Sequence, residues 1–179
     1  MNIIYVRHGE TDWNSEKKLQ GSTDIPLNGQ GILQAEETER LLADEKFDRI
    51  VCSPLERAKR TAEIINRKRG VPLIVDERIR ERGFGDLEGK PYSQEDFNLW
   101  WKKDFDFEKH GMESVGSLLE RTKLMIDELK QKYPTETVLI VSHGGSFVAV
   151  DSYFNGYPDD SQTLRFIPNC TVRKFSCED

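Results

Sequence analysis

The residues best suited to chemistry in this sequence are two histidines that come just after short apolar runs. His8 follows the run 3–6, with Arg7 between them, and His143 follows the run 138–141 at a distance of one residue. A neutral imidazole can act as a nucleophile or a base, and a neighbouring arginine binds oxyanions. A single histidine at a strand end is more often structural. Two such ends with arginines nearby favour a site for an anionic group.

Arg57 is a second indication of an anion site. It lies in the first turn of a predicted helix, for which Ser53 is the expected N-cap and Glu56 closes a capping box. The helix macrodipole disfavours a cation there by ~0.3–1 kcal/mol, so we expect Arg57 and the helix terminus to face one anion. Gly144 and Gly145 would let backbone N–H groups approach such an anion closely.

The elements that must position these residues alternate between short strands and amphipathic helices. Apolar runs predict strands over residues 3–6, 49–52, 73–75 and 138–141, with a last edge strand over 172–175. Helical spacing predicts helices over 28–44, from 53 to about 69, and over 114–133. This alternation predicts a three-layer α/β/α domain with a mostly parallel central sheet, whose ligands bind beyond the carboxyl ends of the strands.

The helix over 28–44 has a predicted N-cap, Asn28, and a predicted apolar side formed by Ile32, Leu33, Ala35, Leu41 and Leu42. The stretch 83–116 is the least regular part of the chain, and we expect it to cover the site as a substrate-covering insertion. Its aromatic residues are expected mainly to pack, and His110 is expected to be solvated.

Length and composition narrow the functional classes. The 179 residues predict one domain over 1–179, and the net charge of −6 argues against a nucleic-acid partner. No apolar run approaches the ~20 residues that span a bilayer, so we expect no membrane association and a cytoplasmic protein. Three cysteines without CxxC spacing favour reduced thiols over a zinc site.

The motifs taken together resemble the histidine phosphatase superfamily, the phosphoglycerate mutase-like family, and within it the small phosphatases. They stand in the family's order over roughly residues 3–150: Arg7-His8-Gly9-Glu10-Thr11 with Asn14, Gln20-Gly21, Asp24-Ile25-Pro26-Leu27, Ser53-Pro54-Leu55 with Arg57-Ala58, Arg80-Glu81, Glu113-Ser114, and Ser142-His143-Gly144-Gly145. The usual Gly-Glu-Ser triplet is broken, because Met112 separates Gly111 from Glu113.

The resemblance implies a role for each matching residue. The catalytic residues are His8, as the nucleophile that becomes phosphohistidine, Glu81, as general acid and base, and His143. The phosphate-binding residues are Arg7, Asn14, Arg57 and Gly144. Glu10 could equally be a structural acceptor. The resemblance implies no cofactor and no metal ligand.

The resulting expectation is a metal-independent phosphatase that acts on a small phosphorylated metabolite. Two alternatives stay open, a mutase that passes the phosphoryl group to a second hydroxyl and an inactive phosphate-binding regulatory module. The natural substrate and the oligomeric state cannot be read from the sequence.

Overall fold

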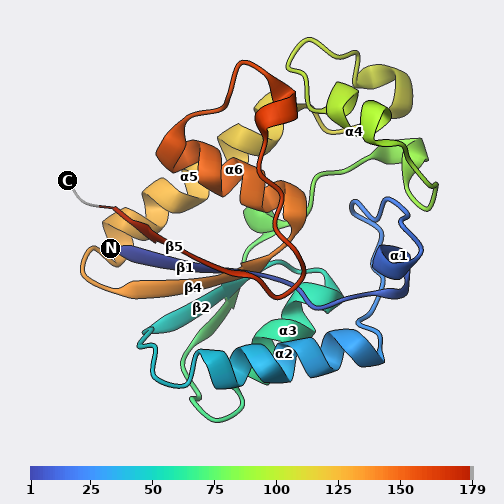
Figure 1. Cartoon of the computed structure of the whole chain (residues 1–179). Helices are drawn as coiled ribbons and strands as arrows, with labels where there is room; N and C mark the ends of the chain where they lie inside the picture. The colour runs from blue at the N-terminus through green and yellow to red at the C-terminus, as the bar shows by residue number, and fades with distance from the viewer. Residues whose placement is uncertain (178–179) are drawn as a thin grey trace.

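The centre of the molecule is a five-stranded sheet with the strand order β3-β2-β4-β1-β5 (Figure 1). The computed structural model describes residues 1–177; residues 178–179, the last two of the predicted domain, lie outside the described part. The strands are β1 (Asn2–Arg7), β2 (Arg49–Cys52), β3 (Leu73–Val75), β4 (Thr137–Ser142) and β5 (Val172–Ser176). All pairs are parallel except β1 with β5, which is antiparallel and lies at one edge. The mostly parallel sheet and its edge strand are thus confirmed.

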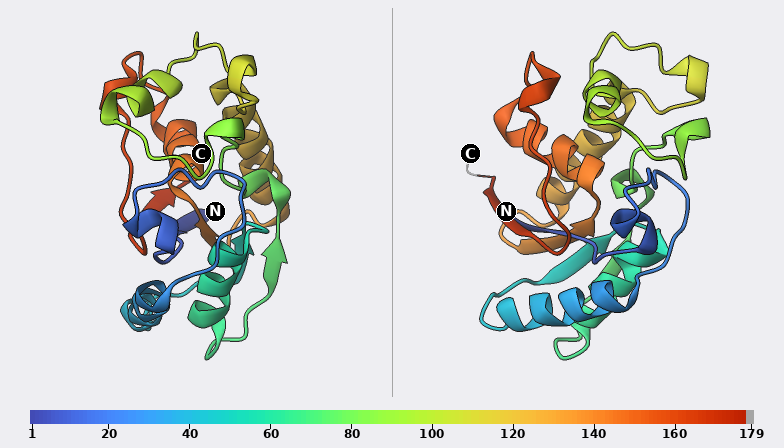
Figure 2. Two further views of the ribbon diagram at one scale, coloured as in Figure 1. Left: turned by 90° about the vertical axis from the view of Figure 1, so that its right-hand side faces the viewer. Right: turned by 45° about the vertical axis from the view of Figure 1, so that its right-hand side comes forward.

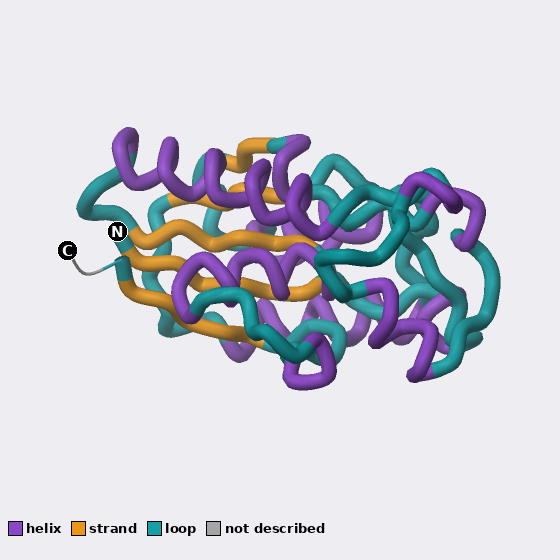
Figure 3. Tube along the Cα trace, turned by 90° about the horizontal axis from the view of Figure 1, so that it is seen from above, coloured by secondary structure: helices purple, strands orange, loops and turns teal. Residues whose placement is uncertain are grey.

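Helices cover both faces of the sheet, with α2 and α3 on one side and α5 and α6 on the other (Figures 1 and 3). The α-helices are α1 (Asp12–Ser15), α2 (Gly29–Leu41), α3 (Glu56–Asn66), α4 (Gln94–Trp100), α5 (Val115–Lys132) and α6 (Gly144–Asn155). Short 3₁₀ turns occur at Glu77–Ile79, Gly85–Leu87, Glu108–His110 and Ser161–Thr163. The predicted three-layer α/β/α architecture is therefore confirmed.

Alternate residues of the central strands fill two separate cores. Ile3 and Tyr5 of β1 pack with Met125 of α5 and Phe147 of α6, whereas Ile4 and Val6 pack on the α2–α3 side. Burying an apolar side chain of this size stabilises the fold by about 1.5–3 kcal/mol. A strand that is buried on both faces cannot shift its register without exposing one core, so its carboxyl end is fixed in space.

Helix α2 buries only part of the apolar side that its sequence predicts. Ala35 and Leu42 are buried as predicted, whereas Leu33 and Leu41 are 59% and 69% exposed. The reason is a close approach of two backbones, because a Cβ on Gly31 would lie 2.1 Å from the backbone oxygen of Glu10. Helical spacing was right about the helix, but the choice of buried face depends on this contact.

The irregular segment 83–116 lies at the same end of the molecule as α1, beyond the carboxyl ends of the parallel strands (Figures 1 and 2). Arg82 anchors its start. The Arg82 side chain is fully buried, lies over the ring of Trp101 at 4.7 Å, and donates hydrogen bonds to the backbone oxygens of Trp100 and Glu113. Burial lowers the pKa of Arg82 to about 10, so the guanidinium stays charged at neutral pH.

Replacing Arg82 with alanine should loosen this segment. The substitution leaves two buried carbonyl oxygens without donors and opens a cavity, and we expect the free energy of unfolding to fall by about 3 kcal/mol. Urea denaturation followed by tryptophan fluorescence measures the loss. Arg60→Ala is the matched control, since Arg60 forms an exposed ion pair with Glu63 and should contribute less than about 1 kcal/mol. A loss from Arg82→Ala no larger than the loss from Arg60→Ala would contradict this role.

Candidate active site

Most of the residues predicted for the site surround one cavity of about 260 Å³ at the carboxyl ends of β1, β2 and β4. Its lining contains six of the seven, namely Arg7, His8, Asn14, Arg57, Glu81 and Gly144. The seventh, His143, is fully buried, and its ring centre lies 5.1 Å from that of His8. The fold therefore brings together residues that are up to about 140 positions apart in the chain, as expected for a parallel sheet.

His8 has one free ring nitrogen. Its Nδ1 lies 2.6 Å from the backbone oxygen of Gly9, which can only accept, so Nδ1 carries the proton and Nε2 keeps its lone pair. The pKa of His8 lies well below its usual range, first because the ring is buried and then because Arg57 and Arg7 are close. A buried, neutral imidazole with a free Nε2 is a competent nucleophile.

Backbone carbonyls hold both arginines in place. Arg57 donates to the backbone oxygens of Thr23 and Gly21 at 2.9 and 2.8 Å, and Arg7 donates to that of Ile167 at 2.7 Å. Burial lowers the pKa of Arg57 to about 10, so it remains a cation at neutral pH. In each guanidinium Nε is buried and has no hydrogen-bond partner. These two charges are compensated by dipoles rather than by an ion pair, which favours binding of an anion between them.

Ser53 does not cap α3 as predicted. The N-cap position is Leu55, with no side-chain hydrogen bond, and Ser53 Oγ lies instead 2.7 Å from Nε2 of His143. Ser53 Oγ also accepts from the backbone N–H of Leu55 at 3.3 Å, and in one of the two neutral tautomers of His143 it donates its own proton to Nε2. The Nδ1 of His143, which is buried without a partner, then carries hydrogen and is left as a donor for a ligand.

Glu81 occupies the N-terminus of α6. One carboxylate oxygen accepts from the backbone N–H of Gly145 at 3.0 Å, and the other accepts from those of Ser146 and Arg82 at 3.2 and 2.8 Å. The expected anion contact through Gly145 is therefore taken by Glu81, because a carboxylate of the chain fills that position. Gly144 still lines the cavity, and a Cβ there would lie 3.6 Å from the guanidinium carbon of Arg7.

Asn14 and Glu10 differ in their surroundings. Oδ1 of Asn14 accepts from the backbone N–H of Thr11 and from the side-chain amide of Asn169, which leaves the Nδ2 group of Asn14 as the donor for a ligand. Glu10 accepts from the side chain of Asn28 at 3.0 Å and does not line the cavity. The structural alternative stated for Glu10 agrees with this contact.

Three aromatic residues of the lining had no role in the sequence-based site. They are Tyr92, Phe97 and Phe166, and Trp101 and Phe84 complete an aromatic wall. Trp101 belongs to the aromatic residues of segment 83–116 that were expected mainly to pack; it is 1% exposed, and it also lines the cavity. Phe166 comes from a coil near the end of the chain, where no motif or periodicity pointed to the site.

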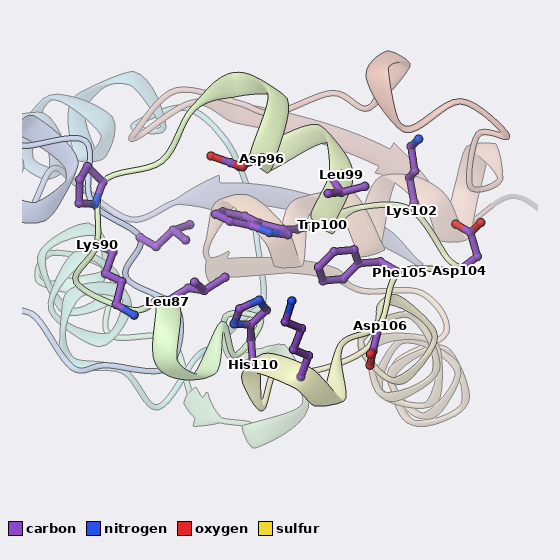
Figure 4. Close-up of a pocket in the computed structure, with 13 residues that line it drawn as sticks. Leu87, Lys90, Asp96, Leu99, Trp100, Lys102, Asp104, Phe105, Asp106 and His110 are labelled. Carbon is purple, nitrogen blue, oxygen red and sulfur yellow. The ribbon is translucent and has the colours of Figure 1, made fainter.

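A second, larger cavity of about 770 Å³ lies on the outer side of segment 83–116 (Figure 4). Trp100, Leu99 and Phe105 form its apolar part, and none of the seven predicted site residues lines it. His110 points into this space, and its Nδ1 lies 3.1 Å from a carboxylate oxygen of Asp86; its side chain is 26% exposed, so it is partly solvated as predicted and also has an acidic neighbour. Within residues 1–177 no cluster of His, Cys, Asp and Glu is placed to hold a metal ion, and no helix is long and apolar enough to cross a membrane.

Comparisons with known proteins agree on one family. The model of the histidine phosphatase superfamily (branch 1) matches residues 3–179, further than the motifs reach. A Bacillus subtilis (strain 168) protein named uncharacterized phosphatase PhoE is 40% identical over 168 residues, 94% of this chain and 84% of its own. Phosphoglycerate mutase-like protein 4 of Arabidopsis thaliana is 32% identical over 182 residues, 97% and 78% of the two chains. The solved structure of a mycobacterial glucosyl-3-phosphoglycerate phosphatase has a TM-score of 0.87 and 28% identity, covering 98% of this chain and 90% of that one.

The neutral state of His8 has a consequence for stability. The unfolded chain binds a proton at His8 near pH 6.5 and the folded chain does not, so stability is lost as the pH falls below about 6.5. Between pH 7.5 and 5.5 this loss is about 1.4 kcal/mol for His8. We therefore expect the free energy of unfolding, measured in urea at both pH values, to fall less in the His8→Asn variant than in the parent protein. The difference between the two falls should be about 1.4 kcal/mol. Equal drops would show that His8 is protonated in the folded state.

Proposed function

Because the chain belongs to the histidine phosphatase superfamily, we propose that it hydrolyses small phosphomonoesters through a covalent phosphohistidine on His8, with Glu81 as general acid and base. The observation that carries the proposal is the state of His8. Its Nδ1 is tied to Gly9, its ring is buried and neutral, and its Nε2 is free in a cavity that also holds Arg7 and Arg57. The family match and the relatives named as phosphatases support an enzyme of this class.

In the first step Nε2 of His8 attacks phosphorus in line with the ester oxygen, and the bond between phosphorus and that oxygen breaks. Arg7 and Arg57 neutralise the charge on the equatorial oxygens, and Nδ1–H of His143 donates to one of them. Glu81 gives a proton to the departing oxygen, which leaves as an alcohol. Preorganised donors of this kind are each worth about 2.7–4 kcal/mol in the transition state, by comparison with oxyanion holes.

In the second step water attacks the phosphohistidine. Glu81, now a carboxylate, removes the proton from water, the P–N bond breaks, and inorganic phosphate leaves with His8 restored. The three backbone N–H groups that hold Glu81 orient it for both transfers. The cycle returns His8 and Glu81 to their starting states, and its only reactants are the substrate and water.

The covalent intermediate can be tested directly. Rapid quenching of a reaction with ³²P-labelled substrate should trap label on His8, stable in base and labile in acid as a phosphoramidate is. His8→Ala should abolish both the label and phosphate release, and EDTA should affect neither in the parent protein. Label on a serine or aspartate, or label that survives His8→Ala, would refute the mechanism.

Substitution of Ser53 tests how the orientation and the tautomer of His143 are fixed. Ser53→Ala removes the proton donor to Nε2, so His143 loses its fixed orientation and tautomer. We expect kcat to fall by about 10–100-fold, as for other residues that orient a functional histidine, with a smaller change in KM and in the free energy of unfolding. Ser152→Ala in α6 is the control, because its hydroxyl bonds only within the helix, to Val148. A loss of stability with unchanged kcat would mean that Ser53 serves the fold alone.

The role of Glu81 is tested through leaving groups. Glu81→Gln should slow hydrolysis of an alkyl phosphate by about 10²–10⁴-fold, whereas the phosphorylation step with p-nitrophenyl phosphate needs no proton and should suffer far less. The amide also turns an NH₂ group toward backbone donors of Gly145 or Ser146, so some general loss is expected. This general loss affects both substrates equally, so it cancels when the two are compared in the same variant by single-turnover kinetics. Equal losses for both substrates would exclude Glu81 as the acid.

A further inference from the structure

We infer that the alcohol released by this enzyme carries a flat, apolar ring and no second anionic group. The inference rests on the proposed phosphatase function and names its substrate class. It follows from the aromatic residues that line the same cavity as His8 and the two arginines, because a phosphate bound at His8 has its ester group in that cavity.

Aromatic rings form a large part of this lining. Five of the residues that line the cavity are aromatic, namely Phe84, Tyr92, Phe97, Trp101 and Phe166, and Leu19 adds a further apolar side chain. The rings pack against one another in a continuous wall: Tyr92 stacks on Phe97 at 5.2 Å, and Phe166 meets Phe97 and Trp101 edge-on at 4.7 and 5.3 Å. Such a wall presents rigid faces and edges that suit another ring.

Two of these rings remain open to solvent. Tyr92 and Phe166 are 38% and 37% exposed, although both line the cavity and both touch Phe97. Large apolar groups that surround a cavity and stay exposed mark a place where a ligand covers them. They come from two distant segments, 83–116 and the coil before β5, so their meeting at one opening is a property of the fold rather than of one local sequence.

The charges of the cavity argue against an acidic leaving group. Of the described residues that line it, Lys18 is the one cation besides Arg7 and Arg57, and it pairs with Glu16 at 2.6 Å. A carboxylate or second phosphate on the leaving group would lie among aromatic rings and near Glu81, and the one further cation, Lys18, is 38% exposed and already has an acidic partner. The same shortage disfavours the mutase alternative, since phosphoglycerate carries a carboxylate.

A comparison of three primary alkyl phosphates separates the effect of leaving-group binding from the effect of leaving-group reactivity. We would compare kcat/KM for 2-phenylethyl phosphate, glycerol 3-phosphate and 3-phosphoglycerate, whose leaving oxygens need similar protonation. Burial of one phenyl ring predicts a preference of about tenfold or more for 2-phenylethyl phosphate over glycerol 3-phosphate, with 3-phosphoglycerate the poorest. Turnover that depends on His8 but shows no preference for the phenyl compound would overturn the inference and leave the proposed function intact. Absence of any turnover, with p-nitrophenyl phosphate included, would overturn the proposed function instead.

Variants of the wall locate the preference. Phe166→Ala should reduce the ratio of the kcat/KM values for 2-phenylethyl and glycerol phosphates by about fivefold or more, and Phe97→Ala should act in the same direction. Leu99→Ala is the matched control: it lies on α4 two residues from Phe97, is 42% exposed, and faces the second cavity (Figure 4). Its ratio should stay within about twofold of the parent value. An unchanged ratio in both wall variants, or an equal fall in Leu99→Ala, would contradict the assignment.

Discussion

The structure depends on the burial of two guanidinium groups without a carboxylate partner at the carboxyl ends of a parallel sheet. Arg7 and Arg57 are held by three backbone oxygens from two loops, and each keeps one buried nitrogen unpaired. Removing such charges from water is expensive, so the surrounding structure must supply the compensating stability. Burial of the two rings is the main reason that the pKa values of His8 and His143 are lowered, and the two guanidinium charges lower them further. The same charges make the cavity favourable for an anion, so the neutral histidines and the anion site depend partly on one electrostatic cause.

The two densely packed cores make this arrangement possible. β1 and β4 are paired, and alternate residues of each strand are buried on the two faces of the sheet. The strand ends that carry Arg7 and His143 are therefore fixed by the packing of the strands. The carboxylate of Glu81 at the N-terminus of α6 completes the set, because the helix terminus satisfies it and also fixes its direction.

Continuous apolar runs were enough to predict the strands of the sheet. Because the reactive residues follow the ends of those strands, the cluster around His8 could be predicted as well. The errors occur where a distant contact overrides a local pattern. Ser53 has the sequence of an N-cap but bonds to His143, which lies 90 positions away. Leu33 and Leu41 were predicted to be buried with Ala35 and Leu42 but are exposed, because the close packing of Gly31 on Glu10 turns the side with Gly31 and Ala35 toward the protein. Phe166 reaches the cavity only because β5 returns to the edge of the sheet beside β1.

The residues that line the cavity come from two parts of the fold with different freedom to vary. Arg7, His8 and Gly144 lie at the ends of buried strands, where a substitution also disturbs the cores on both faces of the sheet. The aromatic residues come from segment 83–116 and from the coil before β5, both of which lie outside the sheet and its covering helices. Substitutions there alter apolar contacts at the opening and leave the strand ends in place. On the function proposed above, selection among substrates can change without moving His8, and the aromatic wall is the part of the molecule that selects the alcohol.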